Sequence, residues 1–113
     1  MEKINWIKQF NEAITICNEN GIIIEMNDKA IKSFEKDGGE KLLGTNVLDC
    51  HPEPSKTILK DLMQNKKTNI YTIEKNGVKK LIYQGPVYDG KDYRGIIEVV
   101  IEIPFDMPHF IRK

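Results

Sequence analysis

Two hydrophobic periodicities alternate along the chain and predict its secondary structure. Apolar residues recur at helical spacing in three segments, residues 2–12, 27–34 and 54–64. Five segments show the two-residue alternation of β-strands: residues 13–19, 22–26, 69–75, 78–88 and 93–103. The order is helix, two strands, two or three short helices and three strands. It predicts an α+β fold, with a five-stranded antiparallel sheet and helices packed on one face.

Two Asn-Gly pairs predict hairpin turns, Asn20-Gly21 and Asn76-Gly77. This dipeptide favours the two-residue type I′ turn, in which both central residues need a positive φ. In the second hairpin such a turn places Asn69 opposite Gln84, so the two amides could be presented to a ligand. The same register puts Tyr71 and Tyr83 on opposite faces, so at most one of these hydroxyls lines the interior.

The N-terminal segment 1–12 is predicted to be an amphipathic helix with Ile4, Ile7 and Phe10 on one face. A helix this short is marginal alone, so its apolar stripe should pack on its own domain or on a second copy. We therefore expect a homodimer with these three residues at its interface. Residues 13–104 are expected to form the main domain and residues 105–113 a tail.

Composition limits the possible partners. The 113 residues are 40% hydrophobic and 30% charged, with zero formal net charge. The balanced charge provides no overall field for attracting nucleic acid or an anionic membrane, and no apolar run approaches the length of a membrane span. Neither a signal peptide nor a disulfide framework is evident. We expect a cytoplasmic protein without nucleic-acid or membrane partners.

The irregular segment 44–55 holds most of the candidate chemistry. Cys50 and His51 are followed by Pro52 and Pro54, which favour a loop, and Ser55 or Glu53 can cap the helix over 54–64. That helix is expected to bury Ile58, Leu59, Leu62 and Met63. Loops held by a rigid scaffold often carry binding residues.

The chain resembles a PAS domain over nearly its whole length. The resemblance rests on the glycine-turn hairpin, the asparagine before the second helix, the Leu-Gly pair before the long helix and the closing meander. These pieces lie at residues 15–23, 26–30, 43–49 and 95–98. The resemblance implies a sensor or interaction module with a pocket between helices and sheet. Its output would act on a signalling partner in trans.

The pocket of such a domain can hold haem, flavin, a small metabolite or nothing. Matching the flavin-binding photosensors through Gly44-Thr45-Asn46 puts Val47 at their cysteine position, so flavin is not expected. The haem-binding subgroup places its ligand within the long helix, which has no histidine here. His51 lies just before that helix and could still bind haem or a metal, with Cys50 as a second soft ligand.

The alternative for these two residues is structural: His51 bonds loop backbone and Cys50 packs as a small hydrophobe. His109 in the tail could be a second axial or metal ligand with His51, or could lie in solvent. Leu59, Met63 and Tyr83 are the other candidate cofactor-binding residues. Neighbouring residues in extended backbone point apart, so Cys50 and His51 do not make a thiol–imidazole catalytic pair, and no enzymatic activity is expected.

The sequence thus predicts a sensory PAS module that binds a small ligand or cofactor and relays this state through dimer or partner contacts. Two alternatives remain. One is a haem or metal sensor that uses His51, and the other is an interaction domain without a ligand.

Overall fold

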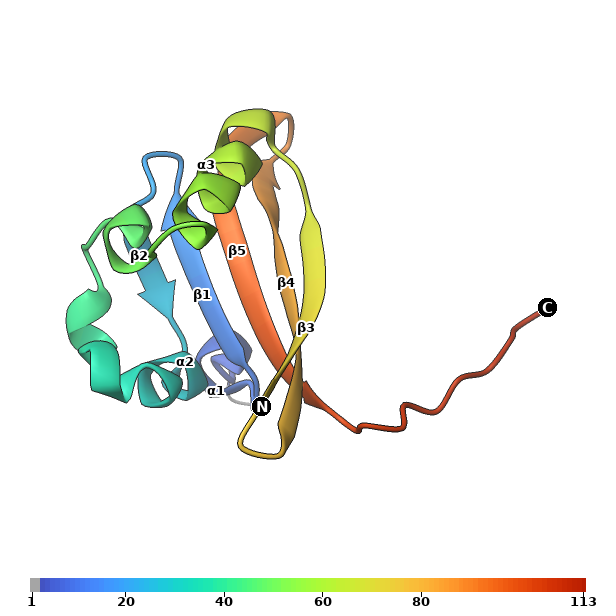
Figure 1. The fold of residues 1–113 in the computed structure, drawn as a ribbon. Helices are drawn as coiled ribbons and strands as arrows, with labels where there is room; N and C mark the ends of the chain where they lie inside the picture. The colour runs from blue at the N-terminus through green and yellow to red at the C-terminus, as the bar shows by residue number, and fades with distance from the viewer. Residues whose placement is uncertain (1–2) are drawn as a thin grey trace.

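The five strands form one antiparallel sheet in the order β2-β1-β5-β4-β3 (Figure 1). A computed structural model describes residues 3–113 of the chain. The strands are β1 (Ala13–Asn18), β2 (Ile23–Met26), β3 (Asn69–Lys75), β4 (Val78–Asp89) and β5 (Asp92–Ile103). The last strand in sequence therefore occupies the centre of the sheet. The predicted α+β class and the five-stranded antiparallel sheet are confirmed.

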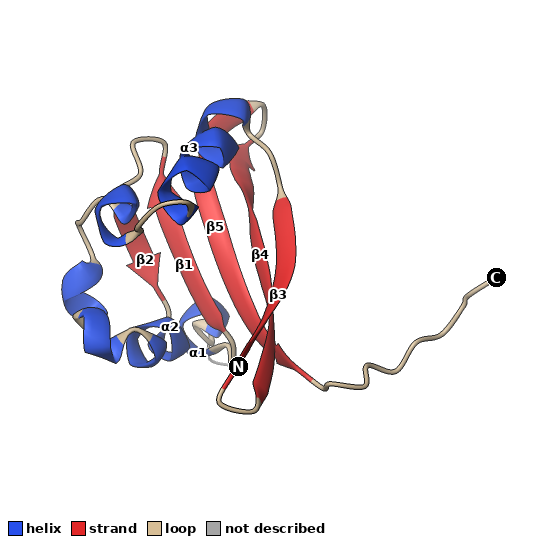
Figure 2. Ribbon diagram, viewed as in Figure 1, coloured by secondary structure: helices blue, strands red, loops and turns tan. Residues whose placement is uncertain are grey.

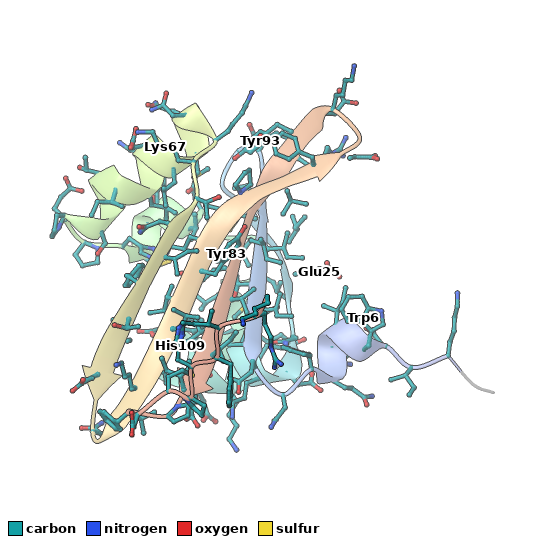
Figure 3. The ribbon with its side chains drawn as sticks, turned by 90° about the vertical axis from the view of Figure 1, so that its right-hand side faces the viewer. Trp6, Glu25, Lys67, Tyr83, Tyr93 and His109 are labelled. Atoms are coloured by element: carbon teal, nitrogen blue, oxygen red, sulfur yellow. The ribbon has the colours of Figure 1, made fainter. Side chains whose placement is uncertain are left out.

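The segments between β2 and β3 cover one face of this sheet (Figure 2). They are α2 (Asp28–Ser33), α3 (Ser55–Asn65) and the 3₁₀ turns η1 (Glu35–Asp37), η2 (Gly39–Leu42) and η3 (Val47–Cys50). α1 (Trp6–Gln9) lies on the opposite face, and Figure 3 shows its Trp6 and Lys67, just after α3, on opposite sides of the sheet. Within residues 3–113, no helix is both long and apolar enough to cross a bilayer.

Gly95 allows β1 and β5 to approach closely. Its φ is +140°, and a Cβ atom there would lie 1.9 Å from the carbonyl oxygen of Cys17. Only glycine tolerates that contact and that backbone angle. This position sets the pairing of Cys17 with Ile96 on the helix-covered face.

The first hairpin differs from its predicted type I′ turn. Asn18 lies opposite Ile22, and Gly21 N–H donates to the Asn18 carbonyl, so the loop has three residues with only Gly21 at positive φ. The Asn18 side-chain oxygen accepts from the backbone N–H groups of Asn20 and Ile22. These local bonds favour the longer loop over the two-residue turn.

The second hairpin has its predicted turn. Asn76 and Gly77 both have positive φ, at 53° and 78°. The register pairs Lys75 with Val78 and Asn69 with Gln84, as expected. The third turn lies at residues 90–91, because Asp89 and Asp92 still pair across the strands.

The N-terminal helix is shorter than predicted. α1 has four residues, Asn5 caps it by accepting from Lys8 N–H, and Phe10 already has extended backbone. Glu2, the predicted start, lies outside the described residues. The helix ends early because the chain must straighten into β1, where the Glu12 carboxylate accepts from the Glu102 backbone N–H.

The covered face of the sheet forms the core with α3. Its most buried cluster comprises Cys17, Ile23, Leu59, Leu62 and Ile96. Ile58 was predicted to be buried, but it is 49% exposed because α3 turns it toward the open edge beside β3. The N-cap position of α3 is Pro54, and the Glu53 carboxylate just before it accepts from Thr57 N–H in the first turn.

Candidate functional site

A cavity of about 100 Å³ lies between the covered face of the sheet and the segments from α2 to α3. Its apolar walls include Ile23, Met26, Phe34, Leu59 and Ile96. The strands supply one side and the irregular segment 44–55 closes part of the other. Cavities with mainly apolar walls and a few convergent polar groups are typical of small-molecule sites.

A row of polar side chains crosses the sheet at this cavity. Register places Thr15 opposite Glu98, Glu98 opposite Gln84, and Gln84 opposite Asn69. Asn69 Nδ2 donates to Gln84 Oε1 at 3.4 Å, and Gln84 Nε2 donates to Glu98 Oε2 at 2.8 Å. Gln84 is buried, so these bonds fix the orientation of its amide.

The charge of Glu98 influences several neighbours. Burial and, secondarily, the Glu98 charge raise the pKa of the Cys17 thiol to about 12. Burial raises the pKa of Cys50, with smaller contributions from nearby carboxylates that include Glu98. Burial and then Glu98 also raise the pKa of Tyr71. Both cysteines are therefore thiols at neutral pH, which makes them poor nucleophiles and poor metal ligands.

A second, more open hollow of about 270 Å³ lies between α3 and the edge formed by β3 and β4. His51, Leu59 and Gln84 line both hollows, so these three side chains mark the boundary between them. Ile58 and Tyr71 line the outer hollow only. A molecule that enters from the β3 edge would pass His51 to reach the cavity.

The loop that carries His51 is held by its own backbone. Asn46 caps η3 by accepting from Leu48 N–H. The His51 Nδ1 atom lies 2.7 Å from the Val47 carbonyl oxygen, and the Cys50 thiol donates to the same oxygen at 3.2 Å. Since a carbonyl only accepts, Nδ1 carries the proton and Nε2 is the free ring nitrogen. The predicted backbone bond of His51 is present.

The structure brings together three of the predicted site residues, since Cys50, His51 and Leu59 line the cavity. Met63 instead packs beside the core, near Gly21. The prediction that Tyr83 is a cofactor-binding residue in the cavity is wrong. Tyr83 pairs with Val99 and Ile70 on the outer face of the sheet, where it covers Gly85. Strand alternation puts it opposite to Gln84.

His109 does not join His51. Residues 105–113 are exposed and extend away from the sheet (Figure 1). Pro104 ends β5, and nothing in the tail folds back over the cavity. Within the described part of the chain, no group of three His, Cys, Asp or Glu side chains could hold a metal ion. Of the two alternatives for His109, the structure therefore shows the one in which it lies in solvent.

Sequence reasoning missed Thr15 and Glu98 as cavity residues. Alternation along the strand puts Glu98 on the face opposite to Ile97, Val99 and Ile101, but nothing local shows that its face is the covered one. One signal was available in the sequence. The predicted hairpin presents the Asn69–Gln84 amide pair, and the next strand carries an acidic residue among isoleucines and valines. Such a residue is costly to cover unless it is paired or functional.

Haem does not fit this cavity. Its volume of about 100 Å³ lies below the range of roughly 300 to 1,000 Å³ usual for sites of larger ligands. No Lys or Arg is among its described lining residues to neutralise carboxylates of a cofactor, and Glu98 would repel them. The free Nε2 of His51 has the right chemistry for iron, but the surrounding space and charge do not.

The sequence matches no protein-family model and no curated protein. Solved structures do match in fold. The PAS domain of the histidine kinase ThkA is 23% identical, with a TM-score of 0.63 over 80% of this chain and 98% of that chain. The chain has a PAS fold.

Two further PAS structures agree. A sensory box sensor histidine kinase from Vibrio cholerae has a TM-score of 0.63 at 17% identity, with 88% of this chain and 87% of that chain covered. The Aer2 receptor from Vibrio cholerae, described as a dual PAS–haem oxygen sensor, has a TM-score of 0.57 at 16% identity, with 82% and 95% covered. The PAS fold that the sequence resembled is thereby confirmed.

Proposed function

We propose that this PAS domain is a sensory signalling module that binds a small molecule in the cavity between α3 and the sheet. The observation that carries the proposal is the cavity itself, whose mainly apolar lining includes Gln84 and Glu98 of the hydrogen-bonded row that Asn69 continues toward the outer hollow. A row that served only to join strands would not need to border a hollow. The solved relatives include domains of sensor histidine kinases, which supports a signalling role.

Signal relay would use the central strand β5. Its covered face bears Glu98 at the cavity, while its other face bears the half-buried residues Ile97, Val99 and Ile101. A strand is one residue thick, so a shift at Glu98 is transmitted directly to that apolar outer face. A second copy or a signalling partner that contacts the outer face would detect the change.

A cavity-filling variant tests this function. Val47 lines the cavity through its side chain, while the Val47 carbonyl holds His51, so Val47→Phe fills the space without removing that bond. Val99→Phe, on the outer face, is the matched control. In a thermal-shift screen of small metabolites we expect at least one compound to raise the Tm of the wild type and of Val99→Phe, but not of Val47→Phe.

Two rival functions predict other results. If the protein is an interaction domain without a ligand, no compound will raise the Tm in a way that depends on the cavity. That result would overturn the proposal. A haem sensor would develop a Soret band with haemin, and this band would disappear in His51→Ala. From the size and charge of the cavity we expect no such band in either protein.

A further inference from the structure

We propose that the cavity selects a small organic cation, with an apolar body and an ammonium- or amidinium-type head that pairs with Glu98. This inference rests on the proposed function and names the class of ligand. It follows from the direction of the hydrogen bonds, the charges around the cavity and the position of the second hollow.

The hydrogen bonds of the polar row all have the same donor-to-acceptor direction, and the row ends on an acceptor. Asn69 donates to Gln84, and Gln84 donates to Glu98, so both ends of the Gln84 amide are used. A carboxylate has several lone-pair sites, and this single amide bond occupies only one of them. The remaining acceptor capacity of Glu98 borders the cavity, where a ligand that donates hydrogen bonds would satisfy it.

The charge of Glu98 is not balanced by its neighbours. Among the residues that the structure describes, no Lys or Arg lines either hollow, and the one ion pair joins Lys67 to Asp61, both outside the two hollows. A half-buried carboxylate strongly favours a cation within about 4 to 6 Å. An anionic ligand would be repelled and would find no positive side chain.

The other polar atoms that the structure describes at the cavity include no strong obligatory donor that faces the ligand. His51 Nδ1 donates to the Val47 carbonyl, so Nε2 is an acceptor whenever the ring is neutral. The Thr15 hydroxyl can accept or donate. The two thiols, Cys17 and Cys50, are protonated and only weak donors. A ligand rich in donors is therefore complementary to this site, whereas a ligand rich in acceptors is not.

The two hollows suit a ligand with two parts. The inner cavity is lined by Glu98 and Gln84, and the outer hollow is flanked by Ile58, Leu59 and Tyr71. A compact charged head in the inner cavity would leave an apolar or aromatic body toward the outer hollow. An amidinium or guanidinium head can also bond a carboxylate through two parallel hydrogen bonds, which adds directional selectivity.

Three nearly isosteric probes test the class: benzamidine, benzamide and benzoate. They share a phenyl ring and a planar three-atom head but carry positive, zero and negative charge. Binding is followed by the amide resonances of Cys50, His51 and Leu59 during titration of the full chain. We expect benzamidine to bind at least about tenfold more tightly than benzamide, and benzoate to bind least.

Two variants assign the preference to Glu98. Glu98→Gln removes the charge but keeps an oxygen that can accept from Gln84 Nε2, so the sheet should remain intact. Glu102→Gln removes the same charge four residues along β5, on the same face but outside both hollows. We expect Glu98→Gln to weaken benzamidine binding at least about tenfold and to leave benzamide unchanged. Glu102→Gln should behave as the wild type.

The outcomes separate the two levels of the proposal. If benzamide or benzoate binds the cavity as tightly as benzamidine, or if Glu98→Gln leaves benzamidine binding unchanged, the cation class is overturned while a ligand sensor stands. If no probe of any charge perturbs the cavity resonances and the metabolite screen also yields nothing, both proposals are overturned.

Discussion

At the scale of single residues, Asn27 joins the start of β1 to the start of α2. Its side-chain oxygen accepts from the backbone N–H groups of Ile14 and Ala30, and its amide donates to the carbonyls of Glu12 and Phe10. The side chain is 2% exposed, so water cannot replace these partners. One asparagine thus caps a helix and positions the strand that borders the cavity.

Asn27→Ala should therefore destabilise the domain strongly. The change removes an N-cap, which costs about 1 kcal/mol, and leaves buried backbone groups unpaired, which costs about 1 to 3 kcal/mol more. We expect the free energy of unfolding in urea to fall by about 2 to 4 kcal/mol. Asn20→Ala, an exposed turn position, is the control and should change it by less than about 0.5 kcal/mol. Equal losses in both variants would contradict this role.

Cys17 makes the free energy of unfolding depend on pH in the alkaline range. Its pKa is raised to about 12 in the folded protein, so the thiol stays neutral there while the thiol of the unfolded chain ionises near its ordinary pKa. The stabilisation is fully present below the unfolded pKa and is lost as pH rises toward 12. Between pH 8.5 and 10.5 we expect this residue to lower the free energy of unfolding by about 2 kcal/mol.

The comparison that isolates this effect is the wild type against Cys17→Ala. The variant loses packing at every pH, but its stability should decline less steeply between pH 8.5 and 10.5 in urea titrations. Parallel curves for the two proteins would show that the thiol does not contribute. Cys50→Ala should follow the wild type more closely, because Cys50 is exposed by comparison.

At the scale of elements, the two Asn-Gly hairpins show how far local sequence can decide a turn. Asn76-Gly77 forms the expected type I′ turn because no neighbouring side chain bonds its backbone. Asn20-Gly21 does not, because Asn18 bonds two backbone N–H groups of the loop. The dipeptide predicts a hairpin correctly in both places, but a residue two positions earlier selects the loop length.

The N-terminal segment that contains α1 remains the predicted dimerisation element, although Ile4 and Phe10 lie just outside the helix. Ile4 is 69% exposed and Phe10 46%, whereas Ile7 is half buried against Ile14 and Ile16. Exposed apolar side chains beside an apolar sheet face are typical of an interface between copies. We expect the double variant Ile4→Glu, Phe10→Glu to reduce the mass in solution from dimer to monomer, measured by light scattering.

These two substitutions keep the hydrogen bonds that the Asn27 amide donates to the backbone carbonyls of Phe10 and Glu12. Deletion of the whole segment would remove those bonds. Ile24→Glu is a matched control, since Ile24 is 51% exposed on the edge strand β2. A wild-type mass in the double variant, or dissociation in the control as well, would remove the N-terminal segment from the interface.

At the scale of the whole molecule, the sheet has two faces of unexpected character. The covered face bears the polar row that ends at Glu98, and the outer face of β5 bears Ile97, Val99, Ile101 and Ile103. A core normally takes the more apolar face. On β5 this arrangement is reversed, which supports the proposed ligand in the cavity and the proposed partner on the outer face.

Local sequence determined the elements of this protein and their order. Hydrophobic period, turn residues and caps act over a few residues, so the strands, α3, the second hairpin and its Asn69–Gln84 pairing could be predicted. His51 and Cys50 could also be placed beside the long helix, because loop and helix are contiguous. The short length of α1 could not, since it depends on how the chain enters β1.

Tertiary structure alone decided the candidate site. Glu98 meets Gln84 across the local β4–β5 hairpin, but it lies opposite Thr15 because β5 inserts between β1 and β4. That second pairing joins segments about 80 residues apart, and no local pattern encodes it. The same pairing turned Tyr83 outward and made the face of Glu98 the covered one. The loop at 44–55 supplies the boundary of the cavity through His51, but its charge and hydrogen-bond polarity come from the centre of the sheet.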